Sequence, residues 1–203
     1  MFLKGLAIGF SIAAPVGPIG LLCIRRSLSD GMVAGLATGM GAATADAVYG
    51  CIAGFGLTAI SNLLVRQSFW FGLFGGGFLC YLGFRNLTNK PAIEAAEASE
   101  KGLISAYTST FVLTLANPLT ILSFAAVFAG FGLGTTTGAD FWAAGMLVGG
   151  VFSGSALWWL LLSGGVGVVR AKVGAPVMRW INWFSGILII GFGLYAIVRL
   201  FFS

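Results

Sequence analysis

The fold is decided by residues 13–26, AAPVGPIGLLCIRR, which lie inside an apolar run that begins at Phe2. This stretch contains Pro15, Gly17 and Pro18. Proline has no backbone N–H to donate to a helix, and glycine tolerates backbone angles that other residues avoid. A helix that served only as a membrane anchor would not need such a break. The stretch therefore predicts an interrupted first helix.

The composition places the chain in a lipid bilayer. Of its 203 residues, 58% are hydrophobic and 8% are charged, and the mean hydropathy is +0.99. Soluble domains carry about 25% charged residues, so this chain cannot cover a surface that faces water. We predict an all-α integral membrane protein with a single polytopic membrane domain over residues 1–203 and no soluble domain.

Six apolar segments reach the ~20 residues that a helix needs to cross the bilayer core. They cover residues 2–24, 33–60, 68–87, 104–130, 141–163 and 180–202, with approximate ends. Of the 11 Lys and Arg residues, eight fall in the first-to-second, third-to-fourth and fifth-to-sixth connections. The positive-inside rule places these connections in the cytoplasm and predicts that both termini are periplasmic. The net charge of +5 is thus a topology signal, and nothing indicates nucleic acid as a partner.

The two halves of the chain resemble each other. Asn117 and Pro118 follow Gly17 and Pro18 by 100 residues, and FSGILIIGFGL follows FGGGFLCYLGF by 110 residues. Because three crossings reverse the orientation, two three-helix halves insert in opposite senses, and such inverted repeats are typical of secondary transporters. We predict six transmembrane helices in two inverted three-helix repeats. The approximate ranges are 1–88 for repeat one, 89–103 for a cytoplasmic linker and 104–203 for repeat two.

Many glycines are predicted to be points of close helix contact, because small residues let helix backbones approach each other in a membrane. The set with four-residue spacing is Gly31, Gly35, Gly39, Gly150 and Gly154. The set that repeats between the third and sixth segments is Gly76, Gly83, Gly186 and Gly193. The tryptophans near segment ends, expected at the membrane interfaces, are Trp70, Trp142, Trp180 and Trp183.

The paired interruptions define the candidate site. Pro15, Gly17 and Pro18 break the first helix near its middle, and Asn117 and Pro118 break the fourth at the corresponding place. Non-helical backbone at this depth is tolerated only where it is buried in protein or lines a wet cavity. One break alone is equally well explained as a packing kink. Two breaks at corresponding places in two halves are typical of a transporter binding site.

Asp46 is the only acidic residue inside a predicted span. A carboxylate at the bilayer centre costs ~2.5–3.5 kcal/mol on insertion scales, so it needs a partner, a wet cavity or a proton. No Lys, Arg or His lies at comparable depth in the other segments, so a structural ion pair is not expected. Asp46 is predicted either to hold the ammonium group of a substrate or to exchange a proton during transport. The structural alternative is a protonated carboxyl bonded to a backbone carbonyl.

Several other polar side chains lie at similar depth, and most are expected to form hydrogen bonds between helices. Those assigned to this role are Ser11, Thr114, Ser123, Ser153 and Ser155. Trp158 and Trp159 also fall deep in a segment, where packing is favoured over the lining of a cavity. The predicted substrate-binding or coupling set is completed by Thr44, Tyr49 and Thr120.

Three stretches carry a family resemblance: APVGPIGLLCIRRSLSDGMVAGLATGMGAATADAVYG from residue 14, the central NPLTILSF and the closing SGILIIGFGLY. Through them the chain resembles the lysine exporter (LysE/RhtB) family of bacterial amino-acid exporters over essentially its whole length. Gly17 and Pro18 match the Gly-Pro of the family's Pro-Gly-Pro signature. Asp46 matches its acidic residue in the second helix, and Asn117 with Pro118 matches its Asn-Pro in the fourth. Many members follow Asn-Pro with lysine, whereas this chain has Leu119, so the identity of the substrate is not carried over.

The resemblance implies a small inner-membrane protein that exports amino acids or close derivatives, driven by the proton gradient or the membrane potential. Its partners would be the substrate, H⁺ and the lipid bilayer, and a homodimer stays open. Backbone N–H groups at the broken helices would hold the carboxylate of a zwitterion. Asp46 would hold its ammonium group or the coupling proton, and one half would rock against the other.

Two other classes of membrane protein stay open as alternatives. A thiol or electron-relay protein needs paired cysteines in both broken helices, but Cys23, Cys51 and Cys80 leave the fourth segment without one. A metal-ion exporter needs several oxygen ligands, and one buried carboxylate without histidine is a poor set. No cofactor or metal is expected. An enzyme is not expected either, because no nucleophile–base pair is visible.

Overall fold

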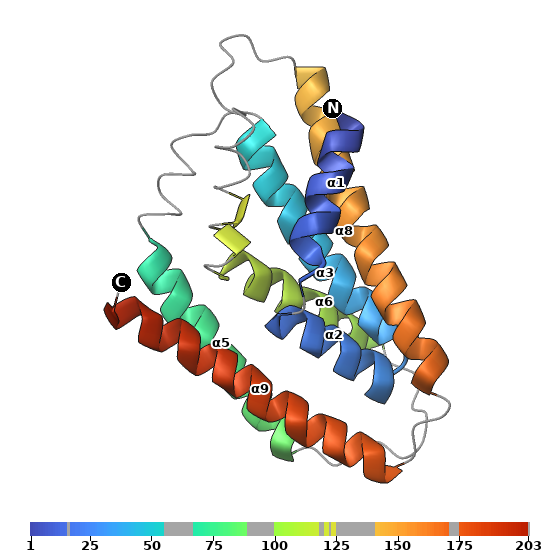
Figure 1. The fold of residues 1–203 in the computed structure, drawn as a ribbon, viewed down its shortest axis with the longest axis vertical. Helices are drawn as coiled ribbons and strands as arrows, with labels where there is room; N and C mark the ends of the chain where they lie inside the picture. Colours follow the sequence, from blue (N-terminus) through green and yellow to red (C-terminus); the bar gives the residue numbers. More distant parts are fainter. Residues whose placement is uncertain are drawn as a thin grey trace.

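The structure, a computed structural model, describes residues 1–15, 17–54, 67–88, 100–117, 120–121, 123–124, 141–170 and 175–202. Within these ranges the regular secondary structure is helical throughout (Figure 1). The helices are α1 (Phe2–Ala13), α2 (Pro18–Ser29), α3 (Met32–Gly54), α5 (Ser68–Thr88), α6 (Glu100–Leu115), α8 (Phe141–Arg170) and α9 (Ala175–Phe202). The prediction of an all-α chain is confirmed for the residues that the structure describes.

The first predicted span is broken. α1 ends at Ala13, α2 begins at Pro18, and the two helices are bent by 80° with respect to each other. Pro18 takes the first position of α2, where the missing N–H would have no helical partner in any case. Gly17, the N-cap residue of α2, is extended, with φ −108° and ψ −163°. The prediction of a broken first helix is confirmed.

α2 extends further than the sequence predicts. Arg25 and Arg26, which we expect in a cytoplasmic loop, are helical, and α2 continues to Ser29. Gly31 then turns the chain into α3 with a φ of 99°. This left-handed angle costs an ordinary residue about 1–2 kcal/mol, which explains a glycine in the turn. That Gly31 is also a close helix contact stays a prediction.

The fourth predicted segment also departs from a continuous helix. α6 begins at Glu100, so the last residues of the predicted linker are already helical, and it ends at Leu115. The N–H of Asn117 donates to the carbonyl of Thr114, three residues back, at 3.2 Å. Helical bonding resumes where the N–H of Ile121 donates to the carbonyl of Asn117 at 3.1 Å. Pro118 lies outside the described residues.

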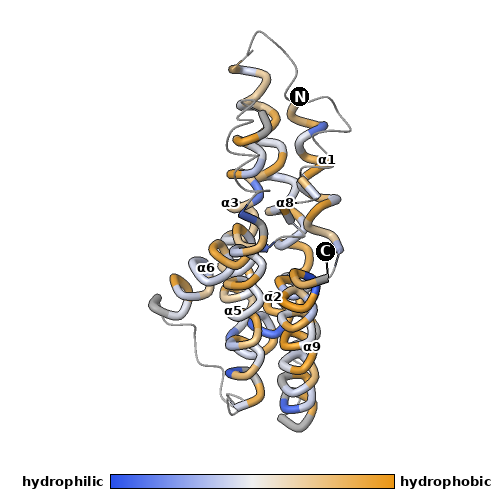
Figure 2. The backbone as a smooth tube through the Cα atoms, turned by 90° about the vertical axis from the view of Figure 1, so that its left-hand side faces the viewer, coloured by the Kyte–Doolittle hydropathy of each residue, from blue (hydrophilic) through white to orange (hydrophobic). Residues whose placement is uncertain are grey.

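Some of the predicted spans correspond to helices whose length and composition suit a membrane crossing. Phe141–Val168 in α8 and Arg179–Phe201 in α9 are each long and apolar enough to cross a membrane. The bent pair α1 and α2 adds a third if it counts as one span. In Figure 2 most of the length of α9 has the colour of hydrophobic residues. Residues 55–60 and 125–130, the ends of the second and fourth predicted segments, lie outside the described residues. α5, the third predicted segment, is not among the helices that meet this test. Six separate spans therefore remain a prediction.

The packing joins helices from the two predicted halves. α1 lies along α8, α3 packs against both α6 and α8, and α5 lies along α9. Figures 1 and 2 show the α5–α9 pair side by side and apart from α1, α3 and α8. α2 lies between these two groups, since it contacts α3 and α8 on one side and α9 on the other.

Glycines form close helix contacts, as predicted. A Cβ at Gly83 would lie 2.8 Å from the carbonyl oxygen of Gly186, and one at Gly193 would lie 2.7 Å from that of Gly76. The α1–α8 crossing is similar, because glycines of each helix face backbone carbonyls of the other. Small residues therefore bring these backbones together without room for a side chain.

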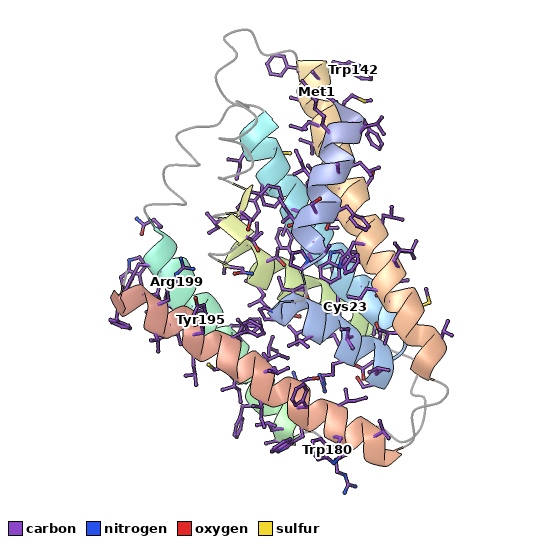
Figure 3. All side chains as sticks on the ribbon, viewed as in Figure 1. Met1, Cys23, Trp142, Trp180, Tyr195 and Arg199 are labelled. Atoms are coloured by element: carbon purple, nitrogen blue, oxygen red, sulfur yellow. The ribbon has the colours of Figure 1, made fainter. Side chains whose placement is uncertain are left out.

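Two tryptophans mark opposite ends of the molecule. Trp142, near the start of α8, lies close to Met1 at one end, and Trp180, near the start of α9, lies at the other (Figure 3). Both rings are largely exposed, at 78% for Trp142 and 68% for Trp180. This agrees with the expectation that tryptophans near helix ends lie at the membrane interfaces.

Candidate functional site between α3, α8 and the broken helices

Asp46 lies on α3 and faces α8. Its side chain is 3% exposed, and the hydroxyl of Ser155 donates a hydrogen bond to Oδ2 at 2.7 Å. The indole Nε1 of Trp159 in turn donates to Ser155 Oγ at 3.1 Å. Ser155 and Trp159 are four residues apart, so both lie on the face of α8 that meets α3. Since Trp159 donates to the serine oxygen, the serine proton is directed at the carboxylate.

Asp46 and Ser155 lie between two apolar clusters. Ala43 of α3 and Trp159 of α8 belong to one cluster, whereas Tyr49 of α3 and Val151 of α8 belong to the other. Asp46 lies between the two cluster positions on its own helix, and Ser155 lies between them on α8. The carboxylate is therefore enclosed by packed side chains, where an unpaired charge is expensive.

No cationic side chain compensates Asp46 within the part of the chain that the structure describes. The partner found there is the neutral hydroxyl of Ser155, and it is not the backbone carbonyl of the structural alternative. An ionised carboxylate has about four acceptor sites on its two oxygens, and one serine occupies a single one. The carboxylate can therefore accept a further donor, either an ammonium group or a proton.

Tyr49, one turn beyond Asp46, connects α3 to the fourth-segment break. Its hydroxyl donates to the carbonyl oxygen of Leu115 at 2.7 Å. Its ring stacks on Phe124 with centroids 5.2 Å apart. The structure thus brings Tyr49 to the interruption at Asn117, as the sequence-based site requires, but with its hydroxyl engaged by the protein.

Thr44 lies on a different side of α3 from Asp46. Its hydroxyl donates to the carbonyl of Met40 at 2.8 Å and accepts from Tyr107 Oη of α6 at 3.0 Å. Residues two positions apart do not share a helix face, so Thr44 is directed to α6 and Asp46 to α8. The predicted site residues on α3 therefore do not all point in one direction.

The first-helix break leaves open space beside the start of α2. Pro15 is exposed, Gly17 and Pro18 are half-buried, and among the described residues no side chain caps the N-terminus of α2. A Cβ placed on Gly17 would meet no atom within 4 Å. The first N–H groups of a helix lack partners within it and carry a partial positive charge. The start of α2 therefore has the chemistry to receive an anionic group.

The second break lies next to the helix that carries Asp46. Asn117 and Thr120 are half-buried. Beyond the break, Ile121 and Phe124 pack into the same apolar cluster as Tyr49. The predicted residues of this break are thus near α3, and Pro118 stays a prediction because it lies outside the described residues.

Ser155 and Trp159 are assigned by the sequence to helix contact and packing, and the structure adds their link to Asp46. Ser155 is 109 positions from Asp46, so nothing local in the sequence joins them. The available signal is weak: a serine and a tryptophan at four-residue spacing occupy one helix face. Such a pair is common in helices and does not by itself indicate a site.

The cysteines do not form a redox pair among the described residues. Cys23, Cys51 and Cys80 are free thiols. Cys23 Sγ lies 3.3 Å from Ser163 Oγ, and Cys80 Sγ donates to the carbonyl of Ile190 at 3.9 Å. Within the described ranges, no three His, Cys, Asp or Glu side chains are grouped so that they could hold a metal ion. Neither alternative class of function gains support.

Comparisons with known proteins identify a family for this chain and a relative of it. A family model described as "LysE type translocator" matches residues 10–200. A protein of Bacillus subtilis (strain 168), named "Putative amino acid efflux protein YcgF", is 25% identical over 198 residues, which are 96% of this chain and 94% of that protein. No solved structure matches the chain.

Proposed function

Because the chain belongs to the LysE translocator family, we propose that it exports amino acids or close derivatives across the bacterial inner membrane. In this proposal it is a secondary transporter coupled to the proton gradient and does not act as an enzyme. Both termini are periplasmic. The end of α2, the start of α6 and the end of α8 face the cytoplasm, and contacts between Arg26 and Ala106 and between Cys23 and Ser163 support their lying at one end.

The buried carboxylate of Asp46 is the observation that carries the proposal. It has one neutral donor, Ser155, among the described residues. A carboxylate in such surroundings is most stable when it gains a proton or a cation. Exchange between a coupling proton and the ammonium group of a substrate would tie the movement of one to the movement of the other.

The start of α2 would hold the carboxylate of the substrate. Its N–H groups have no side-chain cap, and there is space beside Gly17. The positive end of the α2 dipole favours an anion there. A zwitterionic amino acid then has one site for each of its charges. The assignments of Pro15, Pro18, Asn117, Pro118 and Thr120 to the same substrate site belong to this proposal.

The pairing of helices supports two inverted repeats. α1 on α8 corresponds to α6 on α3, because each joins the first helix of one half to the second helix of the other. These pairs also argue against rocking of one whole half on the other, since that motion would separate all of them. We propose that access instead alternates by movement between the α5–α9 pair and the group formed by α1, α3, α6 and α8.

The central experiment measures efflux of labelled amino acids from vesicles that hold the purified protein. We expect wild-type protein to export at least one amino acid, and a protonophore that removes the proton gradient to slow this export. Asp46→Asn, which keeps the shape of the side chain, should abolish export. Ser153→Ala, which removes a hydroxyl that bonds the Gly149 carbonyl within α8, is the control. Wild-type rates for Asp46→Asn across substrates and pH would contradict the role of Asp46.

A further inference from the structure

Arg26 extends from α2 into the crossing of α3 and α6. Its Nη1 donates to Thr38 Oγ1 at 3.1 Å, to the carbonyl oxygen of Ala106 at 3.0 Å and to Thr110 Oγ1 at 3.1 Å. Its Nη2 donates to Ser109 Oγ at 3.0 Å. The sequence indicates Arg26 only as a topology signal, whereas in the structure its guanidinium donates hydrogen bonds to four oxygen atoms of α3 and α6.

All four acceptors are neutral. Within the described residues no carboxylate forms an ion pair with Arg26. Asp30, one turn later, is exposed at the C-cap of α2, where its N–H donates to the carbonyl of Arg26 at 2.8 Å. Asp30 and the negative end of α2 offset part of the charge. However, the planar guanidinium bonds most strongly to a carboxylate, through two parallel hydrogen bonds.

The hydroxyl groups around Arg26 do not depend on it. Thr38 donates to the carbonyl of Ala34 at 2.9 Å, and Thr110 and Ser109 donate to that of Ala106 at 2.9 Å and 3.2 Å. If the guanidinium turned to another acceptor, each hydroxyl would keep its own hydrogen bond. Exchange would therefore leave no buried hydroxyl donor without a partner, which is the costly outcome in such a site.

Arg26 is separate from the site at the start of α2. It lies eight residues after Pro18, roughly 12 Å along the helix axis at 1.5 Å per residue. One carboxylate cannot contact both places at the same time. Arg26 is also at the end of α2 that the proposed orientation places toward the cytoplasm, where an exported substrate enters.

We propose that Arg26 binds the carboxylate of the exported substrate on the cytoplasmic side, before the substrate reaches the start of α2 and Asp46. In this step the guanidinium exchanges the hydroxyls of Thr38, Ser109 and Thr110 for the two carboxylate oxygens. The ligand class is therefore a small molecule with a free carboxylate. This inference rests on the proposed function, because it assigns an entry site to the same transport pathway.

The test compares two substrates in reconstituted vesicles: an amino acid that wild-type protein exports, and its amide, which lacks the carboxylate. For Arg26→Gln we expect the KM of the amino acid to rise by about tenfold, as for the loss of one charged hydrogen-bonded pair, with the KM of the amide unchanged. Arg25→Gln removes the same charge from the next position and should leave both values unchanged. Equal effects of Arg26→Gln on the two substrates, or no effect on either, would overturn the inference.

Arg26→Lys keeps the test decisive if Arg26→Gln does not insert or fold. Lysine preserves the charge but cannot make the bidentate contact, so the KM of the amino acid should still rise relative to that of the amide. An unchanged ratio overturns the inference. Anionic lipid phosphate is another source of a similar ligand. The effect must therefore persist in vesicles of phosphatidylcholine alone, and its restriction to vesicles with anionic lipid would also overturn the inference.

Failure of the inference can be separated from failure of the proposed function. Suppose that wild-type protein exports an amino acid and that Arg26→Gln keeps the wild-type preference for the carboxylate. The inference of an entry site at Arg26 is then wrong, whereas the proposed export function is retained. If wild-type vesicles export no amino acid at all while the protein is folded, the proposed function fails, and the entry site fails with it.

Discussion

The hydroxyl of Tyr49 donates a 2.7 Å hydrogen bond to the carbonyl oxygen of Leu115, the last residue of α6. The carbonyls of a final helical turn have no partner in their own helix, so this bond satisfies one of them. The ring of Tyr49 also stacks on Phe124, which lies beyond the break. A single side chain of α3 therefore contacts the fourth segment on both sides of its interruption.

Removal of this hydroxyl should destabilise the protein. Tyr49→Phe keeps the ring and its stacking but leaves the Leu115 carbonyl without its donor, at a cost of about 1–3 kcal/mol. Reversible unfolding in mixed detergent micelles measures this change. Tyr107→Phe is the matched control, because the Tyr107 hydroxyl bonds another hydroxyl, that of Thr44, and its loss should cost less. Equal stability of Tyr49→Phe and wild type would show that this hydrogen bond does not stabilise the end of α6.

Ser155 is expected to support transport through Asp46. Ser155→Ala removes the donor to the carboxylate and the acceptor of Trp159, so we expect the export rate to fall by about tenfold, which corresponds to ~1.4 kcal/mol. Ser155→Thr keeps a hydroxyl and should retain most of the rate. Ser153→Ala, on the same helix, removes a hydroxyl that bonds the Gly149 carbonyl and serves as the control. Similar losses in Ser153→Ala and Ser155→Ala would contradict a specific role.

The α5–α9 contact should not tolerate an added methyl group. A Cβ at Gly83 would lie 2.7 Å from Ile190 Cγ1 and 2.8 Å from the Gly186 carbonyl oxygen. Overpacking of this kind typically costs about 1–3 kcal/mol, and unfolding of Gly83→Ala in micelles should reveal it. Gly77→Ala, on the same helix, would meet no atom within 4 Å and should be neutral or slightly stabilising. A Gly83→Ala variant that is more stable than Gly77→Ala would contradict this close contact of α5 and α9.

Substitution of Gly17 should change transport without changing the stability of the fold. Its φ of −108° suits other residues, and nothing lies within 4 Å of a Cβ there. Gly17→Ala should therefore unfold like the wild type. If the substrate carboxylate approaches the start of α2, the added methyl group should raise the KM for export severalfold, by crowding that approach. A wild-type KM in Gly17→Ala would argue that no ligand comes close to this backbone.

Local signals in the sequence predicted the break and the carboxylate. Proline restricts the backbone wherever it occurs. The start of α2 at Pro18 can therefore be predicted without information on the residues that pack around it. A carboxylate in an apolar run is unusual in the same local sense, which is why Asp46 could be singled out. Long-range contacts could not be predicted from such local signals. The bond from Ser155 to Asp46 depends on how α3 and α8 are aligned, and that alignment is set by packing along the whole helices.

Arg26 illustrates a different limit. Counting positive charges assigned it, with Arg25, to a cytoplasmic loop, and the helix instead continues to Ser29. The count reports on which side of a membrane a charge lies, not on where a long side chain reaches. The four oxygen atoms around the guanidinium come from α3 and α6, and only the arrangement of three helices brings them together.

The contact of α1 with α8 has a consequence for biosynthesis. Gly5 and Gly9 pack against the backbone of Leu147 and Val151, so α1 leaves the ribosome long before its partner exists. At about 5–20 residues per second, a gap of roughly 140 residues corresponds to about 7–28 s. During that interval the glycine-lined face of α1 must be covered by lipid or by an insertion factor. Residues 1–88 expressed alone would lack this partner, and the final tertiary structure can form only after the second half of the chain has entered the membrane.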